Sequence, residues 1–444
     1  MVGNSMGTTY PATIVAGTFA TGGAERQAFL LAIELAKVGI SATVVSFQPK
    51  PRQVESGPDI SREFPGVPVE YLAPWYFHPA RFVSRSVRGL FLGQSRSSLP
   101  SDTERAGSVV EHKPPRLRRW VSELSKGRQH NQVNLLLAGL ASFRLLALIE
   151  TWSLIRWVKK SHSALVISFL PDPNAASILT GLTAKVPVVA SERNDVDKSL
   201  QPERIRWIRQ TCYPHADLIT ANTEFAVKQL QESLPEKTIV WQPNQQSFLP
   251  PELPLRAISF DLNVVSRLVA HKRVHSIIEA LAALHSSGHC LTLNIYGEGP
   301  EEDRLKAFTL NLGLSKYVHF HGYVPVSEIY GSSREPGIYV TNSEYEGSSN
   351  SLHEAVASGF LPVVANSVTE VFDIISEPLA RLLVTDGTSN DIAEKISGLV
   401  NSQVTGHMHE DVVASFVKYW SKSEHFLEEF LGTCRSIASG EREL

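Results

Sequence analysis

Short apolar segments alternate with amphipathic segments through most of this chain, and this alternation constrains its fold more than any other feature. The segment "ATIVAG" is typical of a buried strand, "AERQAFLLAIELAKVG" of a helix closed by Gly39, and "ISATVVSF" of a second strand. The pattern continues through "ALVISFL", "PVVAS", "ADLITA" and "TIVWQP". Strands that alternate with helices form parallel sheets with helices on both faces. The first half therefore predicts a doubly wound α/β domain.

A second series of the same kind follows the proline-rich segment "QPNQQSFLPPELPLRA" at residues 242–257. Proline removes backbone donors and resists regular structure, which favours a domain boundary there. We predict two Rossmann-like domains, residues 1–250 and 251–420, and a C-terminal helix over residues 421–444 that could cross back to the first domain. Two such sheets are expected to face a cleft, with ligands bound beyond the carboxyl ends of the strands.

Charge is distributed unevenly along the chain. The net charge is -3, which argues against nucleic-acid binding over the whole surface. Residues 81–130, however, carry 11 Lys or Arg against 4 acids and read as a basic insertion in the first domain. The insertion is either a solvated loop or a patch for anionic lipid or a diphosphate-linked acceptor. Its candidate contacts are Arg81, Arg85, Arg88, Arg116, Arg118 and Arg119.

The chain has three widely spaced cysteines and no C-x-x-C pair, which suits a reducing compartment. The N-terminus lacks a basic start followed by an apolar core. The most apolar long stretch, residues 133–150, is interrupted by Asn134 and Arg144, which favours a buried helix over a membrane span. A cytoplasmic protein is expected, with peripheral contact at the inner face of the membrane as a further hypothesis.

The first loop with candidate chemistry is "GTFATGGAER", which joins a strand to a helix and places Gly22 and Gly23 at the helix start. Glycine lets a backbone approach a ligand closely, and amides at a helix N-terminus attract anions. The loop matches neither the dinucleotide fingerprint nor a P-loop. A tight turn without a ligand is an equal alternative.

The second loop is "SRLVAHKR", which follows the strand that opens the second domain. Arg267 and Lys272 leave the strand end five residues apart and could converge on one diphosphate, Arg as a planar fork and Lys as a point charge. The alternative is an ordinary solvated face. No carboxylate or cysteine stands at metal-ligand spacing from the nearby histidines, so no metal site is predicted.

The third loop is "SEYEGSSNSLHEAVASG", in which Glu346 and Glu354 lie eight positions apart. Ser348 or Ser349 is a candidate N-cap for a helix that ends at Gly359. Free amides from Ser349 to Leu352 would then be available to phosphate oxygens. A carboxylate can accept hydrogen bonds from two sugar hydroxyls, but Glu354 could equally serve the helix dipole while Glu346 stays exposed.

This third loop resembles the E-x7-E signature of the retaining GT-B glycosyltransferases of family four. The positions that fall on the pattern are Glu346, Gly347, Glu354, Ala355, Ala357, Gly359, Pro362, Val363, Val364 and Ala365. Three further segments are similar to that family in the same order: "SRLVAHKR" to its diphosphate segment, "LNIYGEGPEEDRL" to its G-x-G-P strand and helix, and "VHFHGYVP" to its nucleotide-base loop. The resemblance covers most of the chain and is weak over residues 50–160.

The resemblance implies a role for each candidate residue. Glu354 would bind the ribose of a nucleotide-diphosphate sugar, Glu346 would contact the transferred sugar, and Arg267 and Lys272 would neutralise the diphosphate without a metal. A UDP-linked donor is favoured over a GDP-linked one, and no other cofactor is expected. The remaining donor-side residues it implies are Gly347, Ser348, Ser349, Asn350, Ser351, Gly297, Tyr323, Val324, Gly22 and Gly23.

Two departures from the family pattern stand out. The segment "SSN" at residues 348–350 replaces a bulkier residue or a proline, and "SFLPDPN" offers Asp172 and Asn174 where many members carry a histidine. These two side chains either face the acceptor or only cap the next helix.

The strands "VISFLPDPN" and "VVASERND", including Glu192 and Arg193, look like those of bacterial enzymes that extend lipid-linked saccharides. A glycan or polyprenyl-diphosphate-linked acceptor is therefore expected, and no nucleic acid. The alternatives are a non-catalytic sugar-nucleotide binding protein and a GT-B epimerase or hydrolase.

Overall fold

The structure is a computed structural model that describes residues 9–19, 23–49, 60–73, 145–193, 203–245, 258–331, 335–377, 379–401 and 405–441. The chain forms two compact units. The first comprises Met1–Ala190, Glu203–Asp217 and Ile437–Leu444, and the second comprises Ser191–Pro202 and Leu218–Ser436. These units do not test the domain limits that the sequence predicts at residues 250 and 420, so those limits stay a prediction.

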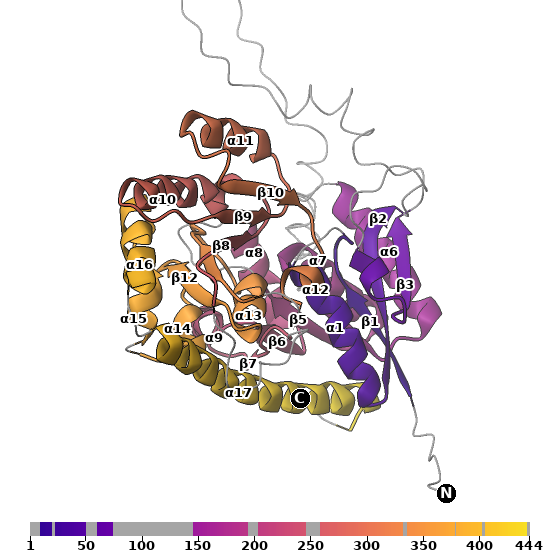
Figure 1. Ribbon diagram of the computed structural model, residues 1–444. Coiled ribbons are helices and arrows are strands. Elements are labelled where there is room, and N and C mark those ends of the chain that lie inside the picture. Colours follow the sequence, from indigo (N-terminus) through magenta and orange to yellow (C-terminus); the bar gives the residue numbers. More distant parts are fainter. Residues whose placement is uncertain are drawn as a thin grey trace, which may run out of the picture. The chain divides into compact units, whose positions relative to one another are not determined.

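The N-terminal sheet has seven strands in the order β3-β2-β1-β4-β5-β6-β7 (Figure 1). Strand β1 pairs in parallel with both β2 and β4, and every residue of β4 and β5 is buried. Burial on both faces is what continuous apolar runs such as "LVISF" require. The strands are β1 (Tyr10–Val15), β2 (Ile40–Pro49), β3 (Val69–Ala73), β4 (Leu165–Phe169), β5 (Val188–Glu192), β6 (Leu218–Ala221) and β7 (Ile239–Trp241).

Of the helices that connect these strands, α1 begins and ends close to the limits that the sequence predicts. Helix α1 is followed by Gly39 at φ 81°, a left-handed conformation that glycine adopts without strain. The helices are α1 (Gly23–Lys37), α6 (Leu145–Ser161), α7 (Pro171–Ala184), α8 (Glu203–Thr211) and α9 (Glu224–Ser233). Two short 3-10 turns, η1 (Ile60–Glu63) and η2 (Tyr213–His215), complete the set.

The second sheet has six strands in the order β10-β9-β8-β11-β12-β13, and each pair of neighbouring strands is parallel. The strands are β8 (Leu262–Val265), β9 (Leu293–Tyr296), β10 (Val318–Gly322), β11 (Ile338–Thr341), β12 (Leu361–Ala365) and β13 (Val384–Thr385). The connecting elements are η3 (Ala270–Lys272), α10 (Val274–Ser286), α11 (Glu302–Asn311), α12 (Val326–Ile329), α13 (Asn350–Ala357), α14 (Val371–Ile374), α15 (Leu379–Leu383) and α16 (Ser389–Asn401).

The last helix, α17, runs without interruption from Thr405 to Ser439 (Figure 1). Its buried side chains Val412, Phe416 and Tyr419 belong to the apolar core that the second sheet shares with α10 and α13. Burial of such side chains, each worth about 1.5 to 3 kcal/mol, holds this helix to the sheet layer.

The predicted fold class is confirmed, because both halves contain a parallel sheet with alternating helices. Across the described residues, no helix is both long and apolar enough to cross a membrane. The basic segment 81–130 and most of the apolar stretch 133–150 lie outside the described residues, so these predictions stay untested.

Candidate functional site

The strand order of the second sheet defines where a ligand site is expected. The chain moves outward from β8 to β9 and β10, then returns to β11 on the other side of β8. The connections after β8 and β11 therefore leave neighbouring strands in opposite directions at the carboxyl edge. Such a switch point is where open α/β sheets bind ligands. The sequence-predicted residues Arg267, Lys272 and Glu346 all lie in these two connections.

Glycine at residue 297 allows the connection after β8 to pass close to the end of β9. Gly297 has φ 134°, and a Cβ there would lie 1.9 Å from the carbonyl oxygen of Ser266. The Gly297 amide donates to the carbonyl of Gly322, 2.7 Å away. Close packing therefore requires glycine at position 297, because any larger residue would displace the backbone beside Arg267.

The two connections are joined by an ion pair and a backbone bond. Lys272 Nζ lies 2.6 Å from Glu346 Oε1, and each side chain is 14% exposed. The Glu344 amide donates to the carbonyl of His271, 2.7 Å away. The other oxygen of Glu346, Oε2, is buried and has no hydrogen-bond partner among the described residues. A buried carboxylate oxygen without a partner can accept a bond from a ligand hydroxyl.

The charges of this region converge on the ring of His271. Burial lowers the pKa of His271 first, Lys272 and Arg267 lower it further, and Glu346 and Glu344 oppose them. All four charged side chains therefore lie within electrostatic reach of one ring. Arg267 itself is exposed and has no ion-pair partner within the described part of the chain. It is available to an anion that enters beside Lys272.

Helix α13 begins where the sequence predicts, with Ser349 as its N-cap. The Ser349 hydroxyl accepts from the Leu352 amide, and Glu354 lies in the second turn with 6% of its surface exposed. The sequence predicts free backbone amides from Ser349 to Leu352, and this prediction is wrong for two of the four. The Ser349 amide donates to Glu370 Oε2 at 3.0 Å, and the Leu352 amide is used by the cap. The Ser351 amide remains a candidate for a phosphate oxygen.

A buried tyrosine supports the start of the same helix. Tyr339 OH is 2.8 Å from Ser351 Oγ, and burial raises the pKa of Tyr339 to about 12. The charge of Glu346 also raises this pKa. Tyr339 therefore stays protonated and can donate a hydrogen bond at neutral pH.

The predicted nucleotide-base loop follows β10. Tyr323 is 40% exposed, and its amide donates to Glu298 Oε1 at 3.3 Å. Val324 is partly buried against the core of the second sheet. An exposed aromatic ring beside a packed aliphatic residue can contact a planar base. That Tyr323 and Val324 bind the base of the donor stays a prediction.

The N-terminal sheet has its own switch point between β1 and β4. Gly17, after β1, has φ 27°, and a Cβ there would meet Pro173 Cγ at 3.1 Å. Gly23 is the first residue of α1, whereas Gly22 lies outside the described residues. Leu170, at the end of β4, adopts φ 75°, a strained conformation for a residue with a Cβ.

Neither Asp172 nor Asn174 caps helix α7 with its side chain. The alternative that these residues only cap the helix is therefore wrong. The N-cap position is Leu170, and no side-chain cap bond forms there. Asp172 pairs with Arg204 at 2.6 Å on the surface. Asn174 is fully buried, accepts from Ser168 Oγ and donates to Tyr213 OH. Its bonds hold helices and strand together, so Asn174 is part of the core rather than of an acceptor site.

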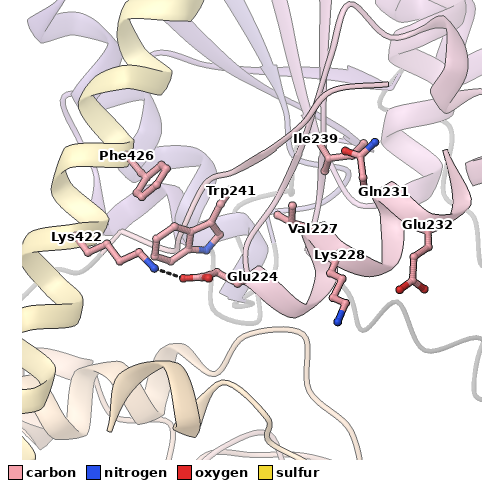
Figure 2. A pocket seen from close by; sticks show the side chains of 9 residues that line it. All are labelled: Glu224, Val227, Lys228, Gln231, Glu232, Ile239, Trp241, Lys422 and Phe426. Carbon is pink, nitrogen blue, oxygen red and sulfur yellow. Dashed lines mark hydrogen bonds and ion pairs between the residues drawn. The ribbon is translucent and has the colours of Figure 1, made fainter. Parts of the chain in front are cut away.

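A separate pocket of about 650 Å³ lies among α9, β7 and α17 in the second unit (Figure 2). Trp241 and Phe426 form its apolar wall, and Lys422 pairs with Glu224 at its rim. None of the predicted donor or acceptor residues lines it. In the described residues, no group of three His, Cys, Asp or Glu side chains gathers as a metal site.

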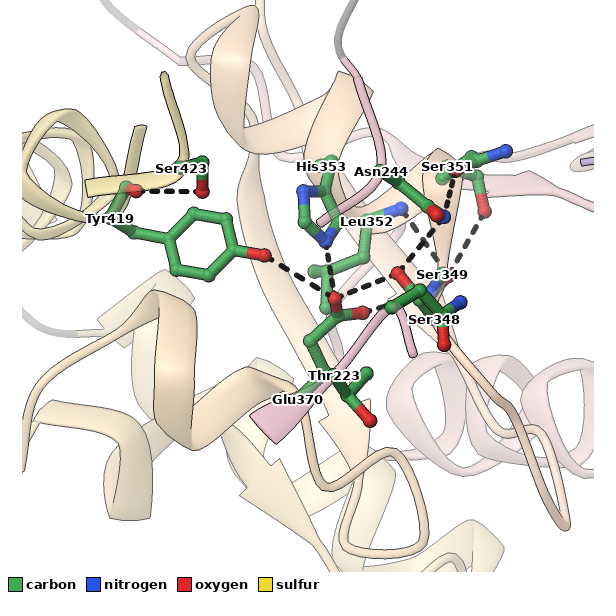
Figure 3. Close-up of polar contacts among 12 residues, drawn as sticks. Thr223, Asn244, Ser348, Ser349, Ser351, Leu352, His353, Glu370, Tyr419 and Ser423 are labelled. Atoms are coloured by element: carbon green, nitrogen blue, oxygen red, sulfur yellow. Dashed lines mark hydrogen bonds and ion pairs between the residues drawn. The ribbon is translucent and has the colours of Figure 1, made fainter. Parts of the chain in front are cut away.

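Sequence reasoning missed a group of side chains that surround the loop between the two glutamates, among them Glu370, His353 and Asn244 (Figure 3). The only signal for Glu370 was its position five residues after β12, in another connection that follows a strand. Its burial and its partners are set by tertiary packing and could not be read from spacing.

The fold resembles that of solved GT-B glycosyltransferases. A variant of Staphylococcus aureus TarM, solved with fondaparinux, alpha-GlcNAc-glycerol and UDP, superposes with a TM-score of 0.66 at 14% identity over 96% of this chain and 100% of that chain. The pneumococcal O-GlcNAc transferase GtfA, solved with UDP and GlcNAc, gives a TM-score of 0.63 at 15% identity over 97% and 99% of the two chains.

Residues 251–413 match the family model described as glycosyl transferases group 1, and this region contains Arg267, Lys272, Glu346 and Glu354. A UDP-N-acetylglucosamine--peptide N-acetylglucosaminyltransferase GtfA subunit from Streptococcus gordonii is 29% identical over 36% of this chain and 28% of its own length. A poly(ribitol-phosphate) alpha-N-acetylglucosaminyltransferase from Staphylococcus aureus strain COL is 30% identical over 32% of this chain and 28% of its own length. The matched stretches therefore span less than a third of either relative.

Proposed function

We propose that this chain is a retaining glycosyltransferase that moves an N-acetylhexosamine or hexose from a UDP-linked donor to a saccharide acceptor. The observation that carries the proposal is the Lys272–Glu346 pair at the β8/β11 switch point, with one carboxylate oxygen left open. The N-acetylglucosaminyltransferase names of the matched relatives favour N-acetylglucosamine as the transferred sugar.

The charges of the site suit the departure of a nucleoside diphosphate. Negative charge builds on the diphosphate as the glycosidic bond breaks, and Arg267 and Lys272 stabilise it. Glu346 Oε2 accepts a hydrogen bond from a hydroxyl of the transferred sugar. The acceptor oxygen then attacks the anomeric carbon from the face that the diphosphate leaves, so the configuration is retained. The departing phosphate takes the acceptor proton, which removes the need for a protein base.

The rest of the donor is held by residues on either side of the charged pair. Glu354 accepts hydrogen bonds from the ribose hydroxyls, and Tyr323 with Val324 contacts the base. Gly297, Gly347 and the segment Ser348–Ser351 border the diphosphate and sugar. The "TGG" loop, with Gly22 and Gly23, borders the acceptor.

The acceptor that we propose is a glycan or a polyprenyl-diphosphate-linked saccharide, in the synthesis of a cell-surface polysaccharide. The basic composition of residues 81–130 supports this acceptor, since each Lys or Arg near an anionic membrane contributes about 1 kcal/mol of attraction. Peripheral binding at the cytoplasmic face of a membrane follows from the same charges.

The test uses the full chain and measures donor binding and sugar transfer separately. Thermal shift with UDP, GDP and ADP sugars identifies the donor, and NMR of the product on membrane extracts gives its anomeric configuration. We expect stabilisation by UDP-GlcNAc, retention, and unchanged transfer in EDTA because no metal takes part. Inverted product would overturn the retaining mechanism, and loss of activity in EDTA would overturn its metal independence.

The two rival functions give different results in the same experiment. A non-catalytic sugar-nucleotide binding protein would be stabilised by a donor but would transfer nothing. An epimerase or hydrolase would consume the donor when no acceptor is present. Stabilisation by none of the nucleotides would contradict all three functions.

A further inference from the structure

One buried carboxylate contacts the loop between Glu346 and Glu354 at two points. Glu370 follows β12 and is 3% exposed. Its Oε1 accepts from Ser348 Oγ at 2.7 Å, and its Oε2 accepts from the Ser349 amide at 3.0 Å (Figure 3). The two oxygens of one side chain thus hold two successive residues, which fixes both the position and the orientation of the loop.

We propose that Glu370 is a positioning residue, which sets the loop between the two glutamates in the geometry that donor binding requires. Among the described residues, Glu370 accepts hydrogen bonds from the loop and from α17, and none joins it to the Lys272–Glu346 pair, so it would act through the loop. This inference rests on the proposed function for its catalytic consequence, although the loop geometry can be measured without it.

The other side of the Glu370 carboxylate is held by two further elements. His353 Nε2 of α13 lies 2.9 Å from Oε1, and Tyr419 OH of α17 donates to the same oxygen at 3.5 Å. His353 is fully buried, and its ring meets the Tyr419 ring edge-on, with centroids 5.3 Å apart. Burial and the charge of Glu370 raise the pKa of Tyr419 well above its usual value, so its phenol stays a donor.

His353 connects this anchor directly to the ribose-side glutamate, because it precedes Glu354 on the same turn of α13. Glu370 therefore holds the helix at His353 and the loop at Ser348 and Ser349. A rotation of α13 that moved Glu354 would have to break a bond to the loop or lengthen the 2.9 Å contact between His353 and Glu370. Buried carboxylates are costly unless fully hydrogen-bonded, which makes such a rotation unfavourable.

The same loop has a second anchor, Asn244, which precedes the segment that links the two sheets. Asn244 Nδ2 donates to Ser348 Oγ at 3.1 Å, and its Oδ1 accepts from Arg193 Nη1 at 2.7 Å. The Ser348 hydroxyl has one proton, which goes to Glu370, and it accepts from Asn244 with a lone pair. Ser348 can serve both anchors only because it is a hydroxyl, and this gives the "SSN" departure a physical reason.

The inference predicts how activity responds to the length and chemistry of these side chains. Glu370→Gln keeps the volume but offers one acceptor where two bonds are needed. We expect kcat/KM for transfer to fall by about 10- to 100-fold, the scale of loss for a site displaced by up to 1 Å. The Ser348→Ala variant should also show a lower kcat/KM. The Ser348→Thr variant keeps the hydroxyl and should retain most of the activity.

A double-mutant cycle separates positioning from loss of stability. If Glu370 acts through Ser348, the double variant Ser348→Ala/Glu370→Gln should lose little more than the worse single variant. Asn263→Ala is the matched control. It removes a partly buried hydrogen bond to the Asp261 carbonyl in the same unit, and it should lower Tm without changing kcat/KM. All measurements are made at a temperature where circular dichroism shows each variant to be folded.

Hydrogen–deuterium exchange of the peptide that contains residues 346–354 gives a readout independent of catalysis. Glu370→Gln should speed exchange there and Asn263→Ala should not. If the unmodified chain transfers no sugar, the proposed function fails, and the exchange result still decides the inference. Unchanged exchange in Glu370→Gln, or equal activity losses in Glu370→Gln and Asn263→Ala, would overturn the positioning role.

Discussion

Lys272 Nζ and Glu346 Oε1 lie 2.6 Å apart and join the connections that follow β8 and β11. The two residues are 74 positions apart in the chain, yet they meet because β8 and β11 are neighbours in the sheet. The pair is mostly buried, and the second carboxylate oxygen has no partner within the described residues. It therefore combines a fixed cation with an open acceptor.

Removal of the Lys272 ammonium should reduce the rate of transfer much more than it reduces the stability of the fold. In Lys272→Ala we expect kcat to fall by about 100- to 1,000-fold, the usual loss when a preorganised charge-stabilising group is deleted. Lys306→Ala is the control, since Lys306 also pairs with a glutamate at 2.7 Å but does so on the surface of α11. Steady-state kinetics with UDP-GlcNAc checks both. Equal activities in the two variants would remove Lys272 from the site.

Glu354 should determine recognition of the ribose. Glu354→Gln is expected to weaken UDP binding by about 10- to 100-fold, since a hydrogen bond to a charged group contributes roughly 1.5 to 3 kcal/mol. Calorimetry with UDP and with 2′,3′-dideoxy-UDP tests the cause. The unmodified chain should prefer UDP, and the variant should bind the two nucleotides with similar affinity. A preference that survives in the variant would assign the ribose to another side chain.

Gly297 should tolerate no side chain. Gly297→Ala imposes φ 134° on alanine and places its Cβ 1.9 Å from the Ser266 oxygen, so we expect a loss of at least about 1 to 3 kcal/mol in stability and a displaced Arg267. Gly398→Ala provides the contrast. Gly398 lies within α16 with open space around it, and alanine there should raise stability by about 0.5 to 1 kcal/mol. Urea unfolding of both variants measures the difference.

Glu150 should make the stability of the first unit fall as pH rises. Burial, and then the charge of Asp172, raise the pKa of Glu150 from 4.5 to about 7. The protonated form is favoured by folding, so its stabilisation is complete below pH 4.5 and is lost as pH rises through 7. Glu150→Gln should therefore be more stable than the unmodified chain at pH 8, by about 1 to 2 kcal/mol since the carboxyl keeps contact with solvent. The gain should vanish at pH 4, as measured by Tm across the range; a gain independent of pH would point to packing instead.

The strands and helices were predictable because each is encoded locally. Buried parallel strands need continuous apolar runs such as "LVISF", and amphipathic helices need a 3.6-residue period. The cap at Ser349 and the helix end at Gly359 also follow from local chemistry, and the structure has both. The side-chain cap that the sequence left open for Asn174 is absent, because a polar residue after a strand looks the same in sequence whether it caps a helix or bonds to Tyr213.

The sequence by itself determined two parallel α/β sheets and the residue types that stand at their strand ends, since both depend on periodicity and on short-range backbone preference. Only the tertiary structure decided which of those residues meet. Strand order brings Lys272 to Glu346, and packing of α13 and α17 buries Glu370 against His353 and the loop at Ser348. Contacts between residues far apart in the chain depend on how the layers pack, and no local pattern records that packing.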